Sequence, residues 1–89
     1  ASTEEYASLN ADTVRKALNT DWSLSETGAS GPTGNRYGDS YGHACIAVSG
    51  PVSKAITVET GDSDREGNMW VFAQKALALL KECVEEAAK

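Results

Sequence analysis

Residues 27–38 read TGASGPTGNRYG, and the rest of the chain is arranged around this stretch. Four of its twelve residues are glycine, and Pro32 stiffens one point within it. Glycine accepts positive φ and lets a ligand approach the backbone closely, so several N–H groups can turn toward one anion. Polar and cationic side chains in the same stretch add hydrogen-bond donors: Thr27, Ser30, Thr33, Asn35 and Arg36.

Two interpretations of this stretch stay open. It is either an anion-binding loop at the mouth of a site or an ordinary surface connection. It is not a Walker loop, because no Gly-Lys-Ser/Thr follows, and it does not match the dinucleotide-binding fingerprint.

The segments on either side of the glycine-rich stretch read as β-strands. Trp22 and Leu24 alternate with serines and lead into the stretch, which predicts a half-buried strand. Residues 41–48 form a nearly continuous run of small and apolar residues, which is typical of a central strand covered on both faces. A Ser-Gly-Pro turn signal and a second alternating run then predict an antiparallel hairpin over residues 41–60.

A helix is expected at each end of the chain. Residues 1–18 begin with a capping box between Ser2 and Glu5, and residues 63–88 begin with a second one between Ser63 and Glu66. The apolar residues that recur at helical spacing in the first helix are Tyr6, Leu9, Val14, Ala17 and Leu18. Those of the second are Met69, Phe72, Ala73, Ala76, Leu77, Leu80, Cys83, Val84 and Ala87.

The patterns together predict one unit over residues 1–89 with an α/β (α+β) fold in the order α-β-β-β-α. We expect a small mixed sheet with the helices packed on it. Three strands leave at least one sheet edge unpaired, and an open edge invites a partner strand. The chain is therefore expected to pair with a complementary chain or with another copy of itself.

The overall charge limits the classes of partner. The net charge is −5, which argues against nucleic acid or an anionic membrane as the main partner. No apolar run approaches the roughly 18 residues that span a bilayer. One histidine and two distant cysteines do not make a metal site, and no cofactor motif is present. Cys45 and Cys83 are expected to be buried free thiols, which fits the reducing cytoplasm.

Three further residues admit a functional and a structural interpretation. His43, within the central strand, is expected to be structural, because the neighbouring sequence offers it no nucleophile. Gly42 leaves room for a ligand or for a neighbouring backbone. Arg65 stands in the first turn of a helix, where the macrodipole disfavours a cation, so it needs either an acidic neighbour or an anionic ligand.

The order of these segments resembles the C-terminal domain of the competence/damage-inducible (CinA-like) protein family, whose members include nicotinamide mononucleotide amidases. The family's Thr-Gly-x-x-Gly-Pro segment matches residues 27–32. Its Gly-Asp-Arg-Glu segment matches residues 61–66 with an inserted Ser63-Asp64 pair. The arginine that usually follows three residues later is replaced by Asn68 or Met69. The resemblance covers about the second half of the family domain, so it implies half of a three-layer α/β/α fold.

The resemblance implies a substrate-binding rather than a catalytic role for this half. The family's nucleophilic serine lies in a Ser-Cys-Thr-Gly-Gly type segment that is expected before residue 1, so no catalytic residue is identified. The implied binding residues for a small phosphate-bearing ligand are Thr27, Gly28, Ser30, Gly31, Gly34, Arg36 and Arg65.

Two classes of function remain open. The first is part of an amidase that hydrolyses the carboxamide of a pyridine nucleotide once a serine-bearing segment completes it. The second is a non-catalytic module with the same fold that binds an anion, a nucleotide or a protein.

Overall fold

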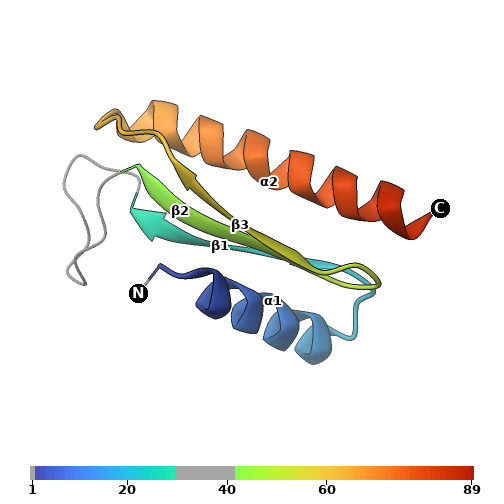
Figure 1. The fold of residues 1–89 in the computed structure, drawn as a ribbon. Helices are drawn as coiled ribbons and strands as arrows, with labels where there is room; N and C mark the ends of the chain where they lie inside the picture. The colour runs from blue at the N-terminus through green and yellow to red at the C-terminus, as the bar shows by residue number, and fades with distance from the viewer. Residues whose placement is uncertain (1, 30–41) are drawn as a thin grey trace.

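The computed structural model describes residues 2–29 and 42–89. The elements are α1 (Glu4–Leu18), β1 (Ser23–Ala29), β2 (His43–Ser49), β3 (Lys54–Glu59) and α2 (Arg65–Ala87). Figure 1 shows the two helices on opposite faces of a thin sheet. This arrangement confirms the predicted order α-β-β-β-α.

The three strands form one sheet in the order β1-β2-β3, and both pairings are antiparallel. The hairpin expected over residues 41–60 is confirmed, with Ile46 opposite Ile56. The sheet was expected to be mixed, but the described strands contain no parallel pair. Residues 50–53 are too short a connection for the crossover that a parallel β2–β3 pair would need.

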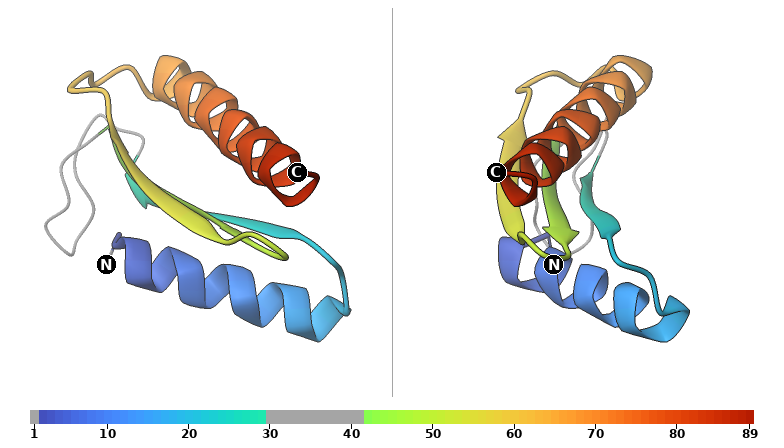
Figure 2. Two further views of the ribbon diagram at one scale, coloured as in Figure 1. Left: turned by 45° about the vertical axis from the view of Figure 1, so that its right-hand side comes forward. Right: turned by 90° about the vertical axis from the view of Figure 1, so that its right-hand side faces the viewer.

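The central strand β2 is buried on both faces, as its composition predicts. Figure 2 shows α1 and α2 as separate layers on the two faces of the sheet. Successive side chains of β2 point to opposite faces, so they alternate between these two layers. Ile46 and Val48 pack in the layer of α2, while Cys45 and Ala47 pack in the layer of α1. Each face of β2 therefore contributes to a different core cluster.

Helix α1 begins later than predicted. Its N-cap is Thr3, whose hydroxyl accepts a hydrogen bond from the backbone N–H of Tyr6 at 3.1 Å. The expected capping box of Ser2 and Glu5 is wrong, because the Ser2 hydroxyl instead donates to the carbonyl oxygen of Thr27 in β1. Ser2 thus ties the start of α1 to the sheet.

The face that α1 turns to the sheet also differs from the prediction. Its buried residues are Ala7 and Ala11, which pack on Cys45 and Ala47. Small side chains on both sides let the helix and sheet approach closely, so this row forms the interface. The larger apolar residues of the predicted stripe are exposed: Tyr6, Leu9, Val14 and Leu18.

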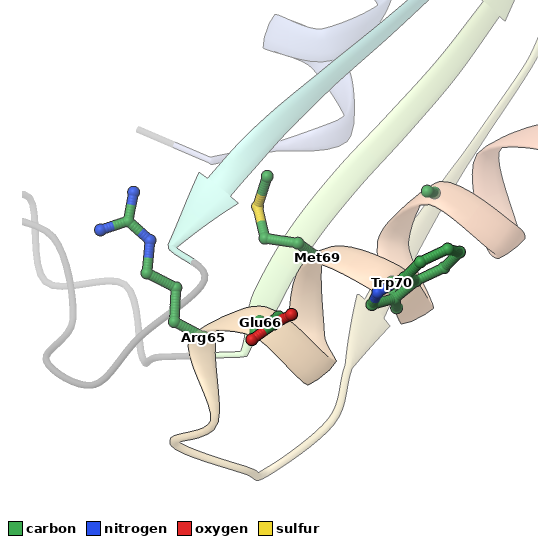
Figure 3. Close-up of a pocket in the computed structure, with 5 residues that line it drawn as sticks. Arg65, Glu66, Met69 and Trp70 are labelled. Atoms are coloured by element: carbon green, nitrogen blue, oxygen red, sulfur yellow. The ribbon is translucent and has the colours of Figure 1, made fainter.

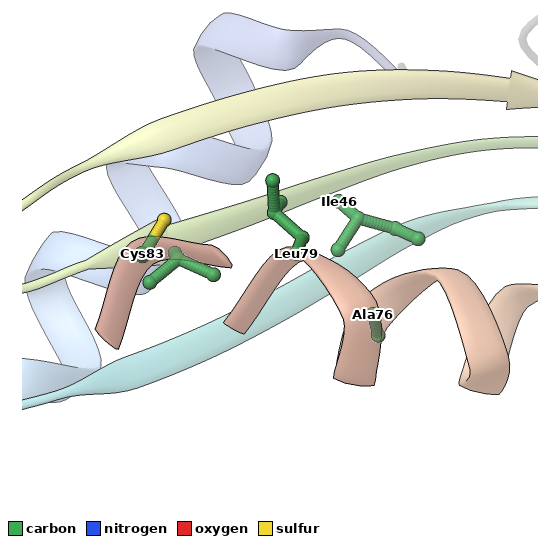
Figure 4. Packing of buried hydrophobic residues seen from close by; sticks show 5 residues of the cluster. Ile46, Ala76, Leu79 and Cys83 are labelled. Carbon is green, nitrogen blue, oxygen red and sulfur yellow. The ribbon is translucent and has the colours of Figure 1, made fainter. Parts of the chain in front are cut away.

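Helix α2 covers the other face of the sheet, as expected. Ala76, Leu79 and Cys83 belong to the same buried cluster as Ile46 of β2, and Figure 4 shows these residues between α2 and the sheet. Phe72 is also buried, but the predicted stripe was too wide, because Met69, Leu77 and Val84 are exposed. The buried row lies at one edge of the predicted stripe, and it includes Leu79, which the prediction left out.

The predicted N-terminal capping box of α2 is wrong as well. The N-cap position is Asp64, and no side chain caps the helix there. The Asp62 carboxylate instead accepts a hydrogen bond from the backbone N–H of Asp64 at 2.9 Å, which shapes the loop before the helix.

Cys45 and Cys83 are both buried and free, as predicted. Among the described residues, neither helix is both long and apolar enough to cross a membrane.

Candidate functional site

The predicted site residues that the structure describes lie at one end of the sheet. The register places Ala29 at the end of β1 beside His43 at the start of β2, and His43 beside Glu59 at the end of β3. Helix α2 begins at this same end, with Arg65 as its first residue. Thr27, Gly28 and Arg65 therefore share one end of the molecule.

Thr27 and Arg65 approach this end from opposite faces of the sheet. Thr27 is paired with Cys45, whose side chain lies in the α1 layer, and directly paired residues point the same way. Arg65 belongs to α2 on the other face. Figure 3 shows its side chain extending from the start of the helix in the direction of β1. Their convergence on one anion stays a prediction.

Gly28 serves strand packing at this end. It is paired with Ala44, and a Cβ at Gly28 would lie 2.1 Å from the carbonyl oxygen of His43 and 2.6 Å from the Cα of Ala44. Both distances are far inside contact, so β1 and β2 approach closely only because this position has no side chain. Ser30, Gly31, Gly34 and Arg36 lie outside the described residues, and their role as ligands stays a prediction.

A pocket of about 520 Å³ opens beside this end of the sheet on one side of α2. Its lining combines a cation, an anion and large apolar groups, as Figure 3 shows. The lining residues are Arg65, Glu66, Met69, Trp70 and Ala73. Half of Met69 and two thirds of Trp70 are exposed to solvent (50% and 66%).

The exposed Trp70 was not predicted from the sequence, and Met69 was predicted to lie in the core. The signal for Trp70 was its place outside the predicted apolar stripe of the last helix. An aromatic ring left in solvent next to a cation is a surface on which a planar, negatively charged ligand can bind.

A buried polar network holds the loop that leads into α2. Asn68 is 2% exposed, accepts from the Thr60 hydroxyl at 2.6 Å and donates to the carbonyl of Asp62 at 2.7 Å. The backbone N–H of Thr60 donates to the carbonyl of Gly42 at 2.9 Å. These bonds fix where α2 starts, and with it the position of Arg65.

Gly42 is required by this network. Its φ is +73°, and a Cβ there would lie 2.3 Å from the Thr60 hydroxyl oxygen. Gly42 was predicted to leave room for either a ligand or a neighbouring backbone. The structure shows a neighbouring segment of the chain in that space. A polar asparagine on an apolar helix face was the sequence signal for this network.

His43 makes structural contacts, as expected, but the premise of that expectation was wrong, because the thiol of Cys45 lies beside it. Its Nδ1 lies 2.8 Å from the Glu59 carboxylate and its Nε2 lies 3.1 Å from the carbonyl oxygen of Ser2. Cys45 Sγ is 3.8 Å from the same Nε2. Glu59, His43 and Cys45 therefore follow one another as the acid, the histidine and the nucleophile do in a hydrolase triad. Cys45 is only 2% exposed, however, and its thiol donates to the carbonyl of Ser2. The triad is closed to a substrate.

A second polar cluster is equally closed. The Ser49 hydroxyl donates to the Asp12 carboxylate and accepts from Arg15 Nε at 2.9 Å, and Ser49 is 2% exposed. A third hydroxyl–carboxylate pair is exposed: Thr57 donates to the Glu4 carboxylate at 2.6 Å, on the α1 face of the sheet. The described residues contain no group of three or more His, Cys, Asp or Glu side chains placed to hold a metal ion.

Comparison with known proteins identifies the family of this fold. Residues 1–84 match the model of the family described as the CinA C-terminal domain. The chain belongs to this family. A CinA-like protein from Gloeobacter violaceus is 36% identical over an alignment of 85 positions, and the match covers 91% of this chain and 20% of the relative.

Solved CinA structures share the fold. A competence-damaged protein (CinA) superfamily protein from Escherichia coli has a TM-score of 0.79 at 24% identity, over 88% of this chain and 45% of the other. A competence or damage-inducible protein from Enterobacter asburiae has a TM-score of 0.67 at 21% identity, over 89% of this chain and 53% of the other. The CinA-like chain thus spans about half the length of these structures.

Proposed function

We propose that this chain is the substrate-binding half of a CinA-type amidase, which hydrolyses the carboxamide of a pyridine nucleotide when a serine-bearing segment completes it. The observation that carries the proposal is the meeting of four features at one end of the sheet. These are the end of β1, the start of α2, the Arg65 guanidinium and the open apolar pocket. Family membership supports the reaction class.

The chemistry of this end suits a nucleotide with a flat ring. Arg65 offers a fixed positive charge and a planar fork of donors to a phosphate. Trp70 and Met69 offer an aromatic and a polarisable apolar surface to a pyridine ring. Glu66, in the same lining, disfavours a second anionic group, which favours a ligand with a single phosphate.

The nucleophile has to come from outside the described residues. Amide hydrolysis needs a hydroxyl or thiol with a base in hydrogen-bonding reach, and it releases ammonia and a carboxylate. The arrangements at Cys45 and Ser49 are buried. The exposed pair of Thr57 and Glu4 lies on the α1 face of the sheet, whereas the pocket is lined by α2. We therefore assign the nucleophile to the family's serine segment, and we place the reaction in the cytoplasm because both cysteines are free thiols.

The test is ammonia release from nicotinamide mononucleotide. We expect none from the 89-residue chain alone and release when a polypeptide with the family's serine segment is added. Arg65→Gln should raise KM about 10-fold or more, because it removes a charge-assisted hydrogen bond of about 1.5–3 kcal/mol. The control Lys81→Gln, more than four turns along α2 from Arg65, should leave KM unchanged. Serine-reagent-sensitive turnover by the chain alone would contradict the proposal and make Ser30 the first residue to mutate.

The second candidate is a non-catalytic module that binds an anion, a nucleotide or a protein. The observation that favours it is the extent of exposed apolar surface on both helices, which includes Leu9 and Leu77 (60% and 65% exposed). Titration calorimetry separates the two candidates. Binding of nicotinamide mononucleotide by the completed protein without ammonia release would favour the module.

A further inference from the structure

Cys45 is a buried thiol that lies next to a histidine and a carboxylate. Its Sγ is 3.8 Å from Nε2 of His43, and Nδ1 of His43 lies 2.8 Å from the Glu59 carboxylate. The proposed function uses none of these three side chains, because it assigns the nucleophile to another segment. A thiol, a base and an acid that orients the base are the groups that an activated thiol requires.

The register of the sheet brings this cluster together. Cys45 and His43 are two residues apart on β2, so both side chains point to the α1 face. On β3, Glu59 is paired with His43 and Thr57 is paired with Cys45, and paired residues point to the same face. Four polar side chains of the two strands therefore lie together beside the start of α1, where the carbonyl of Ser2 contacts two of them.

The carbonyl oxygen of Ser2 can accept a hydrogen bond before and after a proton transfer from sulfur to nitrogen. It lies 3.5 Å from Cys45 Sγ and 3.1 Å from His43 Nε2. While the proton is on sulfur, the thiol donates to this oxygen. Once the proton has moved to Nε2, the imidazolium donates to the same oxygen and to Glu59. The proton can therefore move without leaving the carbonyl unpaired.

Carboxylates from two elements face this cluster. Glu59 of β3 stabilises the positive charge that forms on His43. Glu4, the first residue of α1, accepts a hydrogen bond from the Thr57 hydroxyl at 2.6 Å. Thr57 Oγ1 in turn lies 3.5 Å from Cys45 Sγ. The Glu4 carboxylate is thus connected to the sulfur through the Thr57 hydroxyl, while the Glu59 carboxylate directly contacts the base.

The thiol is covered, but its base is not. Cys45 is 2% exposed, whereas the side chain of His43 is 16% exposed and that of Glu59 is 62% exposed. Ser2, which precedes α1, contacts both Sγ and Nε2. A shift of Ser2 would open the sulfur from the side of His43. A molecule as small as hydrogen peroxide fits such an opening, and a bulky reagent does not.

We propose that Cys45 is a modification site at which a small hydroperoxide oxidises the thiol to a sulfenic acid, with His43 as the base. Nε2 takes the thiol proton, and the sulfur attacks the terminal oxygen of the hydroperoxide. The S–O bond forms as the O–O bond breaks, so the sulfur is oxidised and the peroxide is reduced. His43 then gives the proton to the leaving oxygen, which departs as water or as an alcohol.

The product requires a change at the start of α1. The added oxygen needs space next to Sγ, where the carbonyl oxygen of Ser2 lies 3.5 Å away. The Ser2 hydroxyl also donates to the carbonyl of Thr27 in β1. Oxidation should therefore loosen Ser2 from β2 and from β1 together. The oxidation state of Cys45 is in this way coupled to the end of the sheet where β1 ends.

Cys83 provides an internal comparison. It is also buried, but it packs in the layer of α2, where burial raises the pKa of its thiol. His43 is the single histidine of the chain and lies on the opposite face of the sheet, so Cys83 has no imidazole base. The same separation prevents a disulfide between the two cysteines. The sulfenic acid at Cys45 is thus available to a trapping reagent.

The experiment measures the oxidation of each cysteine separately. The folded 89-residue chain is treated with hydrogen peroxide, the sulfenic acid is trapped with dimedone, and peptide mass spectrometry gives the rate at each cysteine. His43→Gln keeps a polar side chain and removes the base. Glu59→Gln keeps the hydrogen-bond acceptor and removes the charge. Cys83→Ser is the matched control.

We expect the wild type and Cys83→Ser to be oxidised at Cys45 at the same rate. His43→Gln should be oxidised about 10-fold or more slowly, because it lacks general-base assistance. Glu59→Gln should react about 2–5-fold more slowly, as expected for a partly exposed ion pair. After oxidation, amide hydrogen exchange should become faster at residues 3–7 and stay unchanged along α2.

Three results overturn the proposal. The first is an unchanged rate in folded His43→Gln or, if that variant does not fold, in Glu59→Gln, whose mutated side chain is largely exposed. The second is oxidation of Cys83 as fast as that of Cys45 in the native chain. The third is oxidation of Cys45 only after urea has unfolded the chain. The test needs no nicotinamide mononucleotide, so its result is independent of the proposed function.

Discussion

Thr60→Val tests the network that positions the start of α2. Valine keeps the shape of threonine but replaces the hydroxyl with a methyl group. The Thr60 hydroxyl donates to Asn68 Oδ1 at 2.6 Å and accepts from the backbone N–H of Asp62 at 3.2 Å. The substitution therefore removes two hydrogen bonds without opening a cavity.

The expected cost follows from these two bonds. A typical intramolecular hydrogen bond contributes about 0.5–1.5 kcal/mol net, so Thr60→Val should lower the free energy of unfolding by about 2 kcal/mol. For a domain of this size, each kcal/mol shifts the melting temperature by about 4–8 °C, so the expected fall is about 8–16 °C.

The assay is thermal unfolding of the 89-residue chain followed by circular dichroism, with urea unfolding as a second measurement. Thr60→Ser is the matched control, because it keeps the hydroxyl and loses only a methyl group. It should retain most of the wild-type stability. A fall of less than about 2 °C for Thr60→Val would refute the reasoning and show that the network contributes little to the stability of the fold.

Three further predictions follow from buried or crowded groups. Gly28→Ala should destabilise the chain by about 1–3 kcal/mol in urea unfolding, because its Cβ meets the backbone of β2; unchanged stability would mean that the strands separate easily. Burial raises the pKa of the Glu26 carboxyl, so the folded chain loses stability as pH rises through that pKa and the carboxyl ionises. Glu26→Gln should therefore melt at a higher temperature than the wild type at pH 7 and at the same temperature at pH 3. The opposite trend would contradict the burial of Glu26. Burial also raises the pKa of the Cys83 thiol, so Cys83 should not react with a thiol reagent at pH 8 until urea is added, and rapid native labelling would contradict its burial.

The strands were predictable because the spacing of their apolar side chains and the turn signal between them both indicate a hairpin. The run around Ile46 is apolar at successive positions, and a Gly-Pro turn follows it, so both the hairpin and its central strand follow from local pattern. The helix faces were not predictable in the same way. Periodicity identified Leu9 and Val14 as core positions, but the tightly packed row of α1 is Ala7 and Ala11.

The candidate site was predictable only in part, for a similar reason. Strand order alone places Thr27 and Arg65 at the same end of the sheet. The face on which each lies depends on which side of β2 each helix covers, and no local pattern determines that. The sequence marks Asn68 as a polar residue on an apolar helix face and Trp70 as a residue outside the apolar stripe. The partners of Asn68 and the exposure of Trp70 are defined only once the helix is packed.

The alanine interface of α1 has a consequence for how the molecule opens. Ala7 and Ala11 bury little apolar surface, so the helix depends largely on polar ties to the sheet. These ties join Ser2 to Thr27, Glu4 to Thr57, Ala11 to Ser23, and both Asp12 and Arg15 to Ser49.

Urea and heat weaken such ties while the larger side chains under α2 are still packed, so α1 should leave the sheet in a partial unfolding event that α2 does not share. That event lifts Ser2 away from the thiol of Cys45. The rate at which Cys45 becomes accessible to solvent is then a measure of how often this one helix detaches.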